Sequence, residues 1–425
     1  MTTHATGLPA LPPAPARAAD DFEYIPWWTT ATMSSVLDDI DTATWCLLYD
    51  LIAGTANIST GWPRTAADTV AAVMEALWTR QPIRHTTDPG HRHVPERFTA
   101  LNCADPDLGT GRVAAAWCVA RLAVYARHLP HSGVGCRHHQ LAEVATTARH
   151  ILASDEGSWL YTTSLAARYD HDRPFATPEF TAAITIIARS RLSGRDTIEF
   201  GAGTGAITRI TAPHTRNLIA IEPAIGMRAV LQQHTSNFDH VQVRSEDCMS
   251  VGLSDACADV VYEHAALCFV DEPLFAVAEA ARLLRPGGAF VRIISTTEPP
   301  EPITVFNAAF HAQLRLLGHG PGRIVSSGND HRITDWLSAA GITTQIDTIA
   351  TWTSQQPLHR LIAPLLNGSY PYLAAIPSDE RRRAIDGALT ATRLDGDSII
   401  RSAHAVKTAS SPLDSAALRM AGAGR

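Results

Sequence analysis

The sequence predicts an α/β protein in which a mainly helical N-terminal domain precedes a domain built on a parallel sheet. In residues 22–157, apolar residues recur at three- and four-residue spacing, a pattern that indicates amphipathic helices. In residues 158–297, short apolar runs alternate with helical patterns, which is typical of a parallel sheet whose strands are joined by helices. We therefore expect two folded domains with different architectures.

Length and composition exclude several classes of protein. At 425 residues the chain has room for domains of roughly 150 residues each. Its 35 basic and 42 acidic residues give a formal net charge of −7, without the basic excess expected of a non-specific nucleic-acid binder. No uncharged apolar run reaches the ~20 residues of a membrane span, and the 7 scattered Cys favour a reducing compartment. We expect a cytoplasmic protein with neither a nucleic-acid nor a membrane partner.

The N-terminal region divides into a tail and a helical domain. Residues 1–21 are rich in Pro and Ala and predict a disordered tail. Helical periodicity covers residues 34–52, 65–78, 111–128 and 138–153. A Pro-Gly turn within residues 83–94 predicts a small hairpin. We expect a helical domain over residues 22–157, and helices followed by such a hairpin resemble a winged-helix-like domain.

Predicted strands and helices alternate through the rest of the chain. The strands cover residues 197–200, 218–222, 241–244, 259–263 and 289–295, and the helices cover 206–211, 224–234 and 272–284. Further on we expect a helix with Phe306, Phe310, Leu314 and Leu317 on one face, a helix over 333–340, and strands over 346–351 and 398–406. Residues 158–408 then form one domain, and residues 409–425 form a flexible tail.

A glycine-rich turn follows the first predicted strand. Glu199 near the end of that strand precedes Gly201, Gly203 and Gly205, and a helix begins directly afterwards. Glycines in such a turn adopt positive φ and let the backbone approach a ligand closely. The spacing differs from the Gly-x-Gly-x-x-Gly that packs a pyrophosphate against a helix, and the Lys of a phosphate-binding loop is absent. The turn therefore indicates a nucleotide-like cofactor of another kind.

Acidic residues follow the next two strands. Glu222 ends the second strand about 20 residues further on, where a carboxylate can accept hydrogen bonds from two vicinal ribose hydroxyls. Asp247 follows the third strand, where it can accept from an exocyclic adenine amine, although the adjacent Glu246 could exchange roles with it. These residues share the carboxyl edge of consecutive strands, where doubly wound sheets bind their ligands.

With these motifs in place, residues from about 161 to 295 resemble a class I S-adenosylmethionine (SAM)-dependent methyltransferase of the ubiquinone- and menaquinone-biosynthesis type. The match includes the upstream run AARYD at 166–170, the fourth strand with DVVYEH at 259–264, and AARLLRPGG at 280–288. The resemblance implies a Rossmann-like, seven-stranded sheet and SAM as the cofactor.

The resemblance also implies a role for each matching position. Glu199 and the backbone of Gly201, Ala202, Gly203 and Gly205 are expected to hold the methionine part, Glu222 the ribose, and Pro223 the side of the adenine. Asp247 is expected to accept from the adenine amine, Cys248 N–H to reach a ring nitrogen, Glu263 to lie below the sulfonium, and Tyr169 to close the site.

The reaction implied is an in-line attack of an N, O or C nucleophile on the sulfonium methyl, which requires mainly alignment and exclusion of water. A hydroxyl or carbon acceptor needs a general base, for which His264 is the first candidate and Glu263 the second. An amine deprotonated in water needs none. The alternative for His264 is a hydrogen-bonded residue in the wall of the site.

The substrate is expected to be a small molecule or short peptide of secondary metabolism, that is, natural product biosynthesis. The N-terminal domain and residues 354–395, with an aromatic turn at 367–372, are expected to line its pocket, and the N-terminal domain to mediate dimerisation. The alternatives are a SAM-fold enzyme with a non-methylating reaction and a winged-helix DNA-binding regulator with a SAM-sensing domain. We expect no metal, because the His-rich residues 128–139 lack ligand spacing.

Overall fold

The computed structural model describes residues 161–413, except for 173–176, 271–272, 299, 320–327 and 375, together with helical residues between 116 and 154. The chain divides into two units, one of which comprises Trp159–Cys248 and Gly252–Ser415. The other comprises Met1–Ser158, Met249–Val251 and Ala416–Arg425. The predicted N-terminal tail, the hairpin and the first two predicted helices lie outside the described residues. The helical residues described between 116 and 154 fall within the third and fourth predicted helices, except for Ser154, which lies one residue beyond the fourth.

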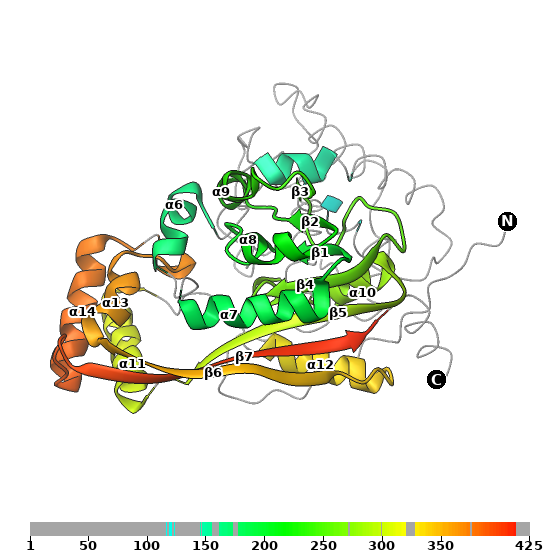
Figure 1. Ribbon diagram of the computed structural model, residues 1–425. Coiled ribbons are helices and arrows are strands. Elements are labelled where there is room, and N and C mark those ends of the chain that lie inside the picture. Colours follow the sequence, from blue (N-terminus) through cyan, green and yellow to red (C-terminus); the bar gives the residue numbers. More distant parts are fainter. Residues whose placement is uncertain are drawn as a thin grey trace, which may run out of the picture. The chain divides into compact units, whose positions relative to one another are not determined.

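The larger unit is built on one 7-stranded sheet with the strand order β3-β2-β1-β4-β5-β7-β6 (Figure 1). The strands are β1 Asp196–Phe200, β2 Asn217–Ile221, β3 Val241–Arg244, β4 Ala258–His264, β5 Leu284–Glu298, β6 Gln345–Pro357 and β7 Ile399–Pro412. Strands β1 to β5 pair in parallel, whereas β7 is antiparallel to both of its neighbours. The predicted seven-stranded, Rossmann-like sheet is confirmed.

The last strand corrects the predicted start of the C-terminal tail. We expected the strand to end at residue 406 and a flexible tail to begin at 409, but β7 continues to Pro412, which pairs with Ala289 of β5. Ala409 and Ser411 are almost completely buried. β7 lies between β5 and β6, where small side chains pack easily. The small, polar residues that predicted a tail are therefore part of an inner strand of the sheet.

Helices cover both faces of this sheet. They are α6 Thr163–Asp172, α7 Pro178–Ile187, α8 Thr208–Thr211, α9 Ile225–Thr235, α10 Pro273–Leu283, α11 Glu301–Leu316, α12 Gly328–Ala339, α13 Leu358–Leu366 and α14 Ser378–Thr392. A π-helical turn, Ala188–Leu192, extends α7, and short 3-10 turns occur at Ala212–His214, Leu267–Phe269 and Pro371–Leu373. The sequence pattern does not predict α6 or α7. The latter begins at a recognisable cap, because the Thr177 side chain accepts the Phe180 N–H and Pro178 occupies the first turn.

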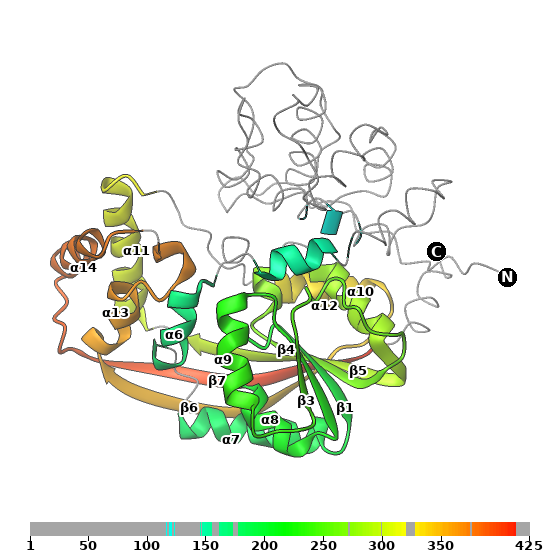
Figure 2. The ribbon, with the colours of Figure 1, turned by 90° about the horizontal axis from the view of Figure 1, so that it is seen from above.

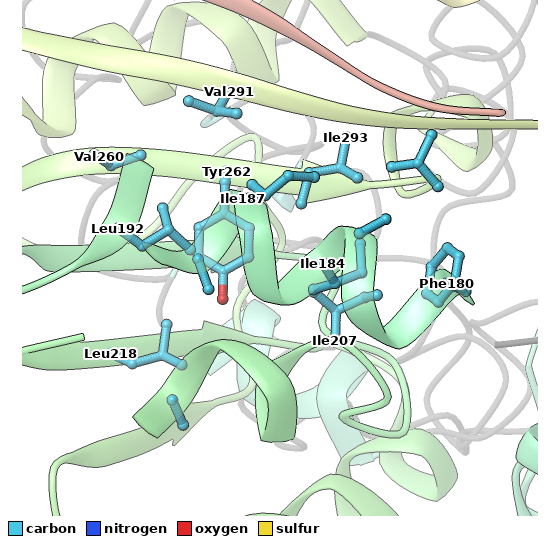
Figure 3. Close-up of a cluster of buried hydrophobic side chains, with 14 residues drawn as sticks. Phe180, Ile184, Ile187, Leu192, Ile207, Leu218, Val260, Tyr262, Val291 and Ile293 are labelled. Atoms are coloured by element: carbon cyan, nitrogen blue, oxygen red, sulfur yellow. The ribbon is translucent and has the colours of Figure 1, made fainter. Parts of the chain in front are cut away.

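The main core lies between α7 and the sheet (Figure 3). Phe180, Ile184 and Ile187 recur at helical spacing and pack on Tyr262 and Ile293, all of them at most 4% exposed. Alternate residues of β4 and β5 face this helix, as the two-residue period of a strand requires. The packing fixes which face of the sheet each site residue lies on.

A second core belongs to α11, α13 and α14, at one end of the long strands β5, β6 and β7 (Figure 1). Phe306, Phe310 and Leu314 are buried along one face of α11, as predicted, and Leu317 is partly buried just after the helix. Helices α13 and α14 are an insertion between β6 and β7. We call α11, α13 and α14 the helical cap.

Candidate functional site

The glycine turn leads from β1 into α8 with all three of its glycines at positive φ: Gly201 at 64°, Gly203 at 59° and Gly205 at 85°. A Cβ on Gly201 would lie 2.4 Å from the Ala266 Cβ, so Gly201 is required by packing within the protein. A Cβ on Gly203 would meet nothing within 4 Å. The backbone at Gly203 therefore leaves room for a ligand at the carboxyl edge of the sheet, and the turn fits a cofactor of the predicted kind.

Glu222 joins this turn to the end of β2. Its Oε2 accepts the Gly203 N–H at 2.8 Å and its Oε1 accepts the Ala224 N–H at 2.9 Å. Arg228 donates to the carbonyls of Glu222 at 3.0 Å and Pro223 at 2.7 Å, which fixes the chain after the strand. Burial raises the pKa of Glu222 to about 7, although both N–H donors act in the opposite direction. Further donors, such as a ribose diol, would favour the ionised carboxylate.

Glu199 lies on the same face of the sheet as Tyr262, the face that α7 covers. Its Oε2 accepts hydrogen bonds from Thr208 Oγ1 at 2.7 Å and from the Tyr262 hydroxyl at 3.0 Å. Burial and, to a smaller extent, the charge of Glu222 raise its pKa to about 7. Glu199 thus holds β1, β4 and α8 together beneath the glycine turn. Its contact with a methionine group stays a prediction.

Helices α6 and α9 both hold the glycine turn at Thr204. Asp170 of α6 accepts from Thr204 Oγ1 at 2.5 Å, and His234 of α9 contacts the Thr204 carbonyl through Nδ1 at 2.8 Å. Beside them, the ring of Tyr169 meets that of Tyr161 edge to face, with centroids 5.5 Å apart. The predicted closing residue Tyr169 therefore lies on a helix that is hydrogen-bonded to the turn.

Glu246 and Asp247, the two acidic residues after β3, have different environments. Arg244 Nε donates to both carboxylate oxygens of Glu246 at 3.0 Å. Burial alone would raise the pKa of Glu246, but Arg244 outweighs it and the pKa is lowered. Since Glu246 is committed to this ion pair, Asp247 is the better candidate for the adenine amine. Cys248 beside it is buried, at 7% exposure.

Glu263, near the end of β4, stabilises the turn that follows the strand. It is 3% exposed, and its Oε2 accepts the N–H groups of Ala266 at 2.9 Å and Leu267 at 3.3 Å. Ala265 has a φ of 53°, which makes this turn tight and dependent on such bonds. A general-base role would compete with them, so the geometry favours a structural role for Glu263.

His264 lies on the opposite face of β4 from Glu263, because successive side chains of a strand alternate. Its Nε2 lies 2.9 Å from Ser295 Oγ, and its ring packs against Phe180 with centroids 5.7 Å apart. Burial lowers the pKa of His264 to about 4. The imidazole is neutral at pH 7 and only weakly basic, which favours the wall-residue alternative. The two candidate bases cannot approach one acceptor atom from the same side.

Residues that the sequence analysis did not assign complete the site. Tyr262, Thr208 and Thr204 connect the turn to the sheet and helices through the bonds described above. Tyr262 could have been found only with the register, which places it opposite Glu199. No group of three or more His, Cys, Asp or Glu side chains that could hold a metal occurs in the described ranges. The His-rich residues 128–139 lie outside them, as do Asp271 and Glu272.

Comparisons with known proteins show similarity in the part of the chain that carries this site. The family described as "Methyltransferase domain" matches residues 198–292, from β1 into β5. The malonyl-acyl-carrier protein O-methyltransferase of Hahella chejuensis is 31% identical over 120 residues. That match covers 28% of this chain and 41% of the relative, so the chain spans about two fifths of the length of this curated protein.

Solved structures of similar proteins include YcgJ of Bacillus subtilis, at 15% identity, with a TM-score of 0.37 over 54% of this chain and 97% of the other. A putative methyltransferase of Bacillus halodurans has 14% identity and a TM-score of 0.37, with the same coverage. Within the described part of this chain, no helix is long and apolar enough to span a bilayer.

Proposed function

We propose that this chain, whose residues 198–292 match the family described as "Methyltransferase domain", is a class I SAM-dependent methyltransferase that transfers the methyl group of SAM to an N, O or C nucleophile. The acceptor is a small molecule or short peptide of natural product biosynthesis. The hydrogen bond from the Gly203 N–H to Glu222 carries this proposal. It puts a buried carboxylate beside the part of the turn where the backbone has free space for a ligand.

The residues at this edge fit SAM in type and order. Glu222 has the acceptor capacity to bind a ribose diol, and Asp247 follows the next strand, where an adenine amine is expected. Gly203 leaves the space in which the methionine part would approach the backbone. SAM, when bound, supplies an electrophilic methyl group on a sulfonium. The protein holds donor and acceptor in line and excludes water.

The environments of the two candidate bases restrict the acceptor. Glu263 is committed to the backbone of the turn after β4, and His264 is a weak base that faces α7. An acceptor that is already nucleophilic at neutral pH, such as an amine free base or a carboxylate, needs neither of them. The structure therefore favours acceptors of this kind over unactivated alcohols.

Calorimetric titration with SAM and S-adenosylhomocysteine (SAH) tests the cofactor assignment. We expect micromolar binding that Glu222→Ala weakens at least tenfold, about 1.4 kcal/mol. Asp239→Ala is the matched control, since Asp239 is exposed in the turn before β3. Binding that is absent from the intact protein, or equal in both variants, would contradict the assignment. Formation of SAH from SAM with an acceptor distinguishes methyl transfer from a non-methylating reaction.

A further inference from the structure

Helix α6 lies between the glycine turn and the helical cap. On one side, Asp170 bonds Thr204 of the turn. On the other, Asp172 accepts from Ser369 Oγ and from Asn367 Nδ2, the latter at 3.3 Å, in the segment that follows α13. Figures 1 and 2 both show α6 between α9 and the cap helices. Helix α6 is thus hydrogen-bonded to both the glycine turn and the helical cap, and its side chains lie close to both.

Arg168 lies on that cap side, one helical turn before Asp172. It is half-buried, and its Nε is completely buried without a hydrogen-bond partner. Among the residues that the structure describes, no carboxylate pairs with its guanidinium, which carries five N–H donors. Burying the Nε–H group without an acceptor is unfavourable. The side chain is therefore suited to an acceptor from outside the chain.

Arg381 of α14 is the second cation of this region. Its Nε donates to the Leu366 carbonyl at 2.9 Å, and its Nη1 donates to Leu373 at 3.2 Å and to Ile376, all neutral acceptors. Burial lowers the pKa of Arg381, and the charge of Arg168 lowers it further. Two arginines from different helices thus lie close enough to repel each other.

The nearby carboxylates do not balance this charge. Asp172 accepts from Ser369 and Asn367. Glu380 pairs with His319, and also with Arg383 at 3.4 Å. In the described ranges, no ion pair joins either of these acids to Arg168 or Arg381. The two guanidinium groups between α6 and α14 therefore have no carboxylate partner among the described residues.

We propose that Arg168 and Arg381 bind an anionic group of the methyl acceptor, a carboxylate or a phosphate, and so orient the acceptor toward the cofactor. This inference rests on the proposed methyltransferase function. The planar guanidinium fork of Arg matches the paired oxygens of both groups. The cofactor also carries a carboxylate, but Arg168 is two residues from Asp170, roughly 200° around the helix axis, and so faces away from the turn.

Calorimetry on the intact protein saturated with SAH provides the test, with malonate and inorganic pyrophosphate as probes. We expect the intact complex to bind at least one of them, Arg168→Gln to weaken that binding at least tenfold, and Arg168→Lys to weaken it less. Arg189→Gln is the control, because Arg189 is exposed in the π-helical turn after α7. SAH affinity should be equal in all four proteins.

The other outcomes separate the two proposals. If Arg168→Gln weakens SAH but not 5′-methylthioadenosine, which lacks the carboxylate, Arg168 holds the cofactor and the acceptor proposal is wrong. If the intact SAH complex binds neither probe, or if Arg168→Gln binds as the intact protein does, the proposal is also wrong. If the intact protein does not bind SAH, the methyltransferase function itself fails.

Discussion

Glu222 should make cofactor affinity depend on pH. Its pKa is raised to about 7 by burial, and a ribose diol donates stronger hydrogen bonds to the ionised form, in which both oxygens accept. The ionised fraction rises from about 3% at pH 5.5 to about 90% at pH 8, so SAH affinity should rise over this range, by at most about 30-fold. Glu222→Gln removes this group and keeps the side-chain shape, so its weaker affinity should be nearly independent of pH.

Calorimetry at both pH values, in two buffers of different ionisation enthalpy, measures the affinity and the protons released. The amino group of SAH titrates in both proteins, and the Glu222→Gln variant corrects for it. Equal pH dependence in the two proteins would refute the reasoning, because the titrating group would then be another one. Glu199, whose pKa is also raised to about 7, is the group to examine in that case.

The same pKa predicts how stability depends on pH. An acid whose pKa is 4.5 in the unfolded chain and about 7 in the folded protein ionises first in the unfolded chain. The cofactor-free protein therefore loses stability as pH rises from about 4.5 to 7, by about 3 kcal/mol for this group. Denaturation of Glu222→Gln should show a smaller loss between pH 5 and pH 8.

Four further substitutions test the geometry of the site. Gly203→Ala should abolish SAH binding while the thermal midpoint falls by less than in Gly201→Ala, whose Cβ would meet Ala266; the reverse order would contradict the assignment of Gly203 to ligand contact. Glu263→Ala should destabilise the protein by about 2 kcal/mol in chemical denaturation, because two buried N–H groups lose their acceptor; an unchanged midpoint would argue against its structural role. His264→Asn should leave the pH profile of kcat unchanged. If an ionisation disappears from the profile of this variant, His264 acts as a general base after all.

The strands were predictable because central parallel strands carry continuous apolar runs. β3 has the predicted bounds, β1 differs from them by one residue at its start, and β2 and β4 differ by one residue at each end. β5 begins earlier than predicted, because the strand includes Gly287 and Gly288, which precede the predicted start at residue 289. Helix α6 was not predictable from periodicity, since only Leu165 and Ala166 are buried in it.

The sequence predicted the order of the site motifs along the strands, but it did not predict which site residues are hydrogen-bonded to each other. Motif spacing puts Gly203 and Glu222 on one edge, and the structure joins them directly. Strand alternation alone would have separated Glu263 from His264. The partner of Glu199 depends on the register between β1 and β4, which places Tyr262 beside it. Such contacts arise from distant parts of the chain, and no local pattern encodes them.

A crystal structure of the protein with SAH tests the central claim most directly. The account predicts that the ribose hydroxyls donate to Glu222 and that the amino-acid part lies over Gly203. It also predicts that the adenine amine reaches Asp247, with Arg168 free of the SAH carboxylate. SAH bound away from the edge of β1 and β2, or a Glu222 without a ribose contact, would contradict the account.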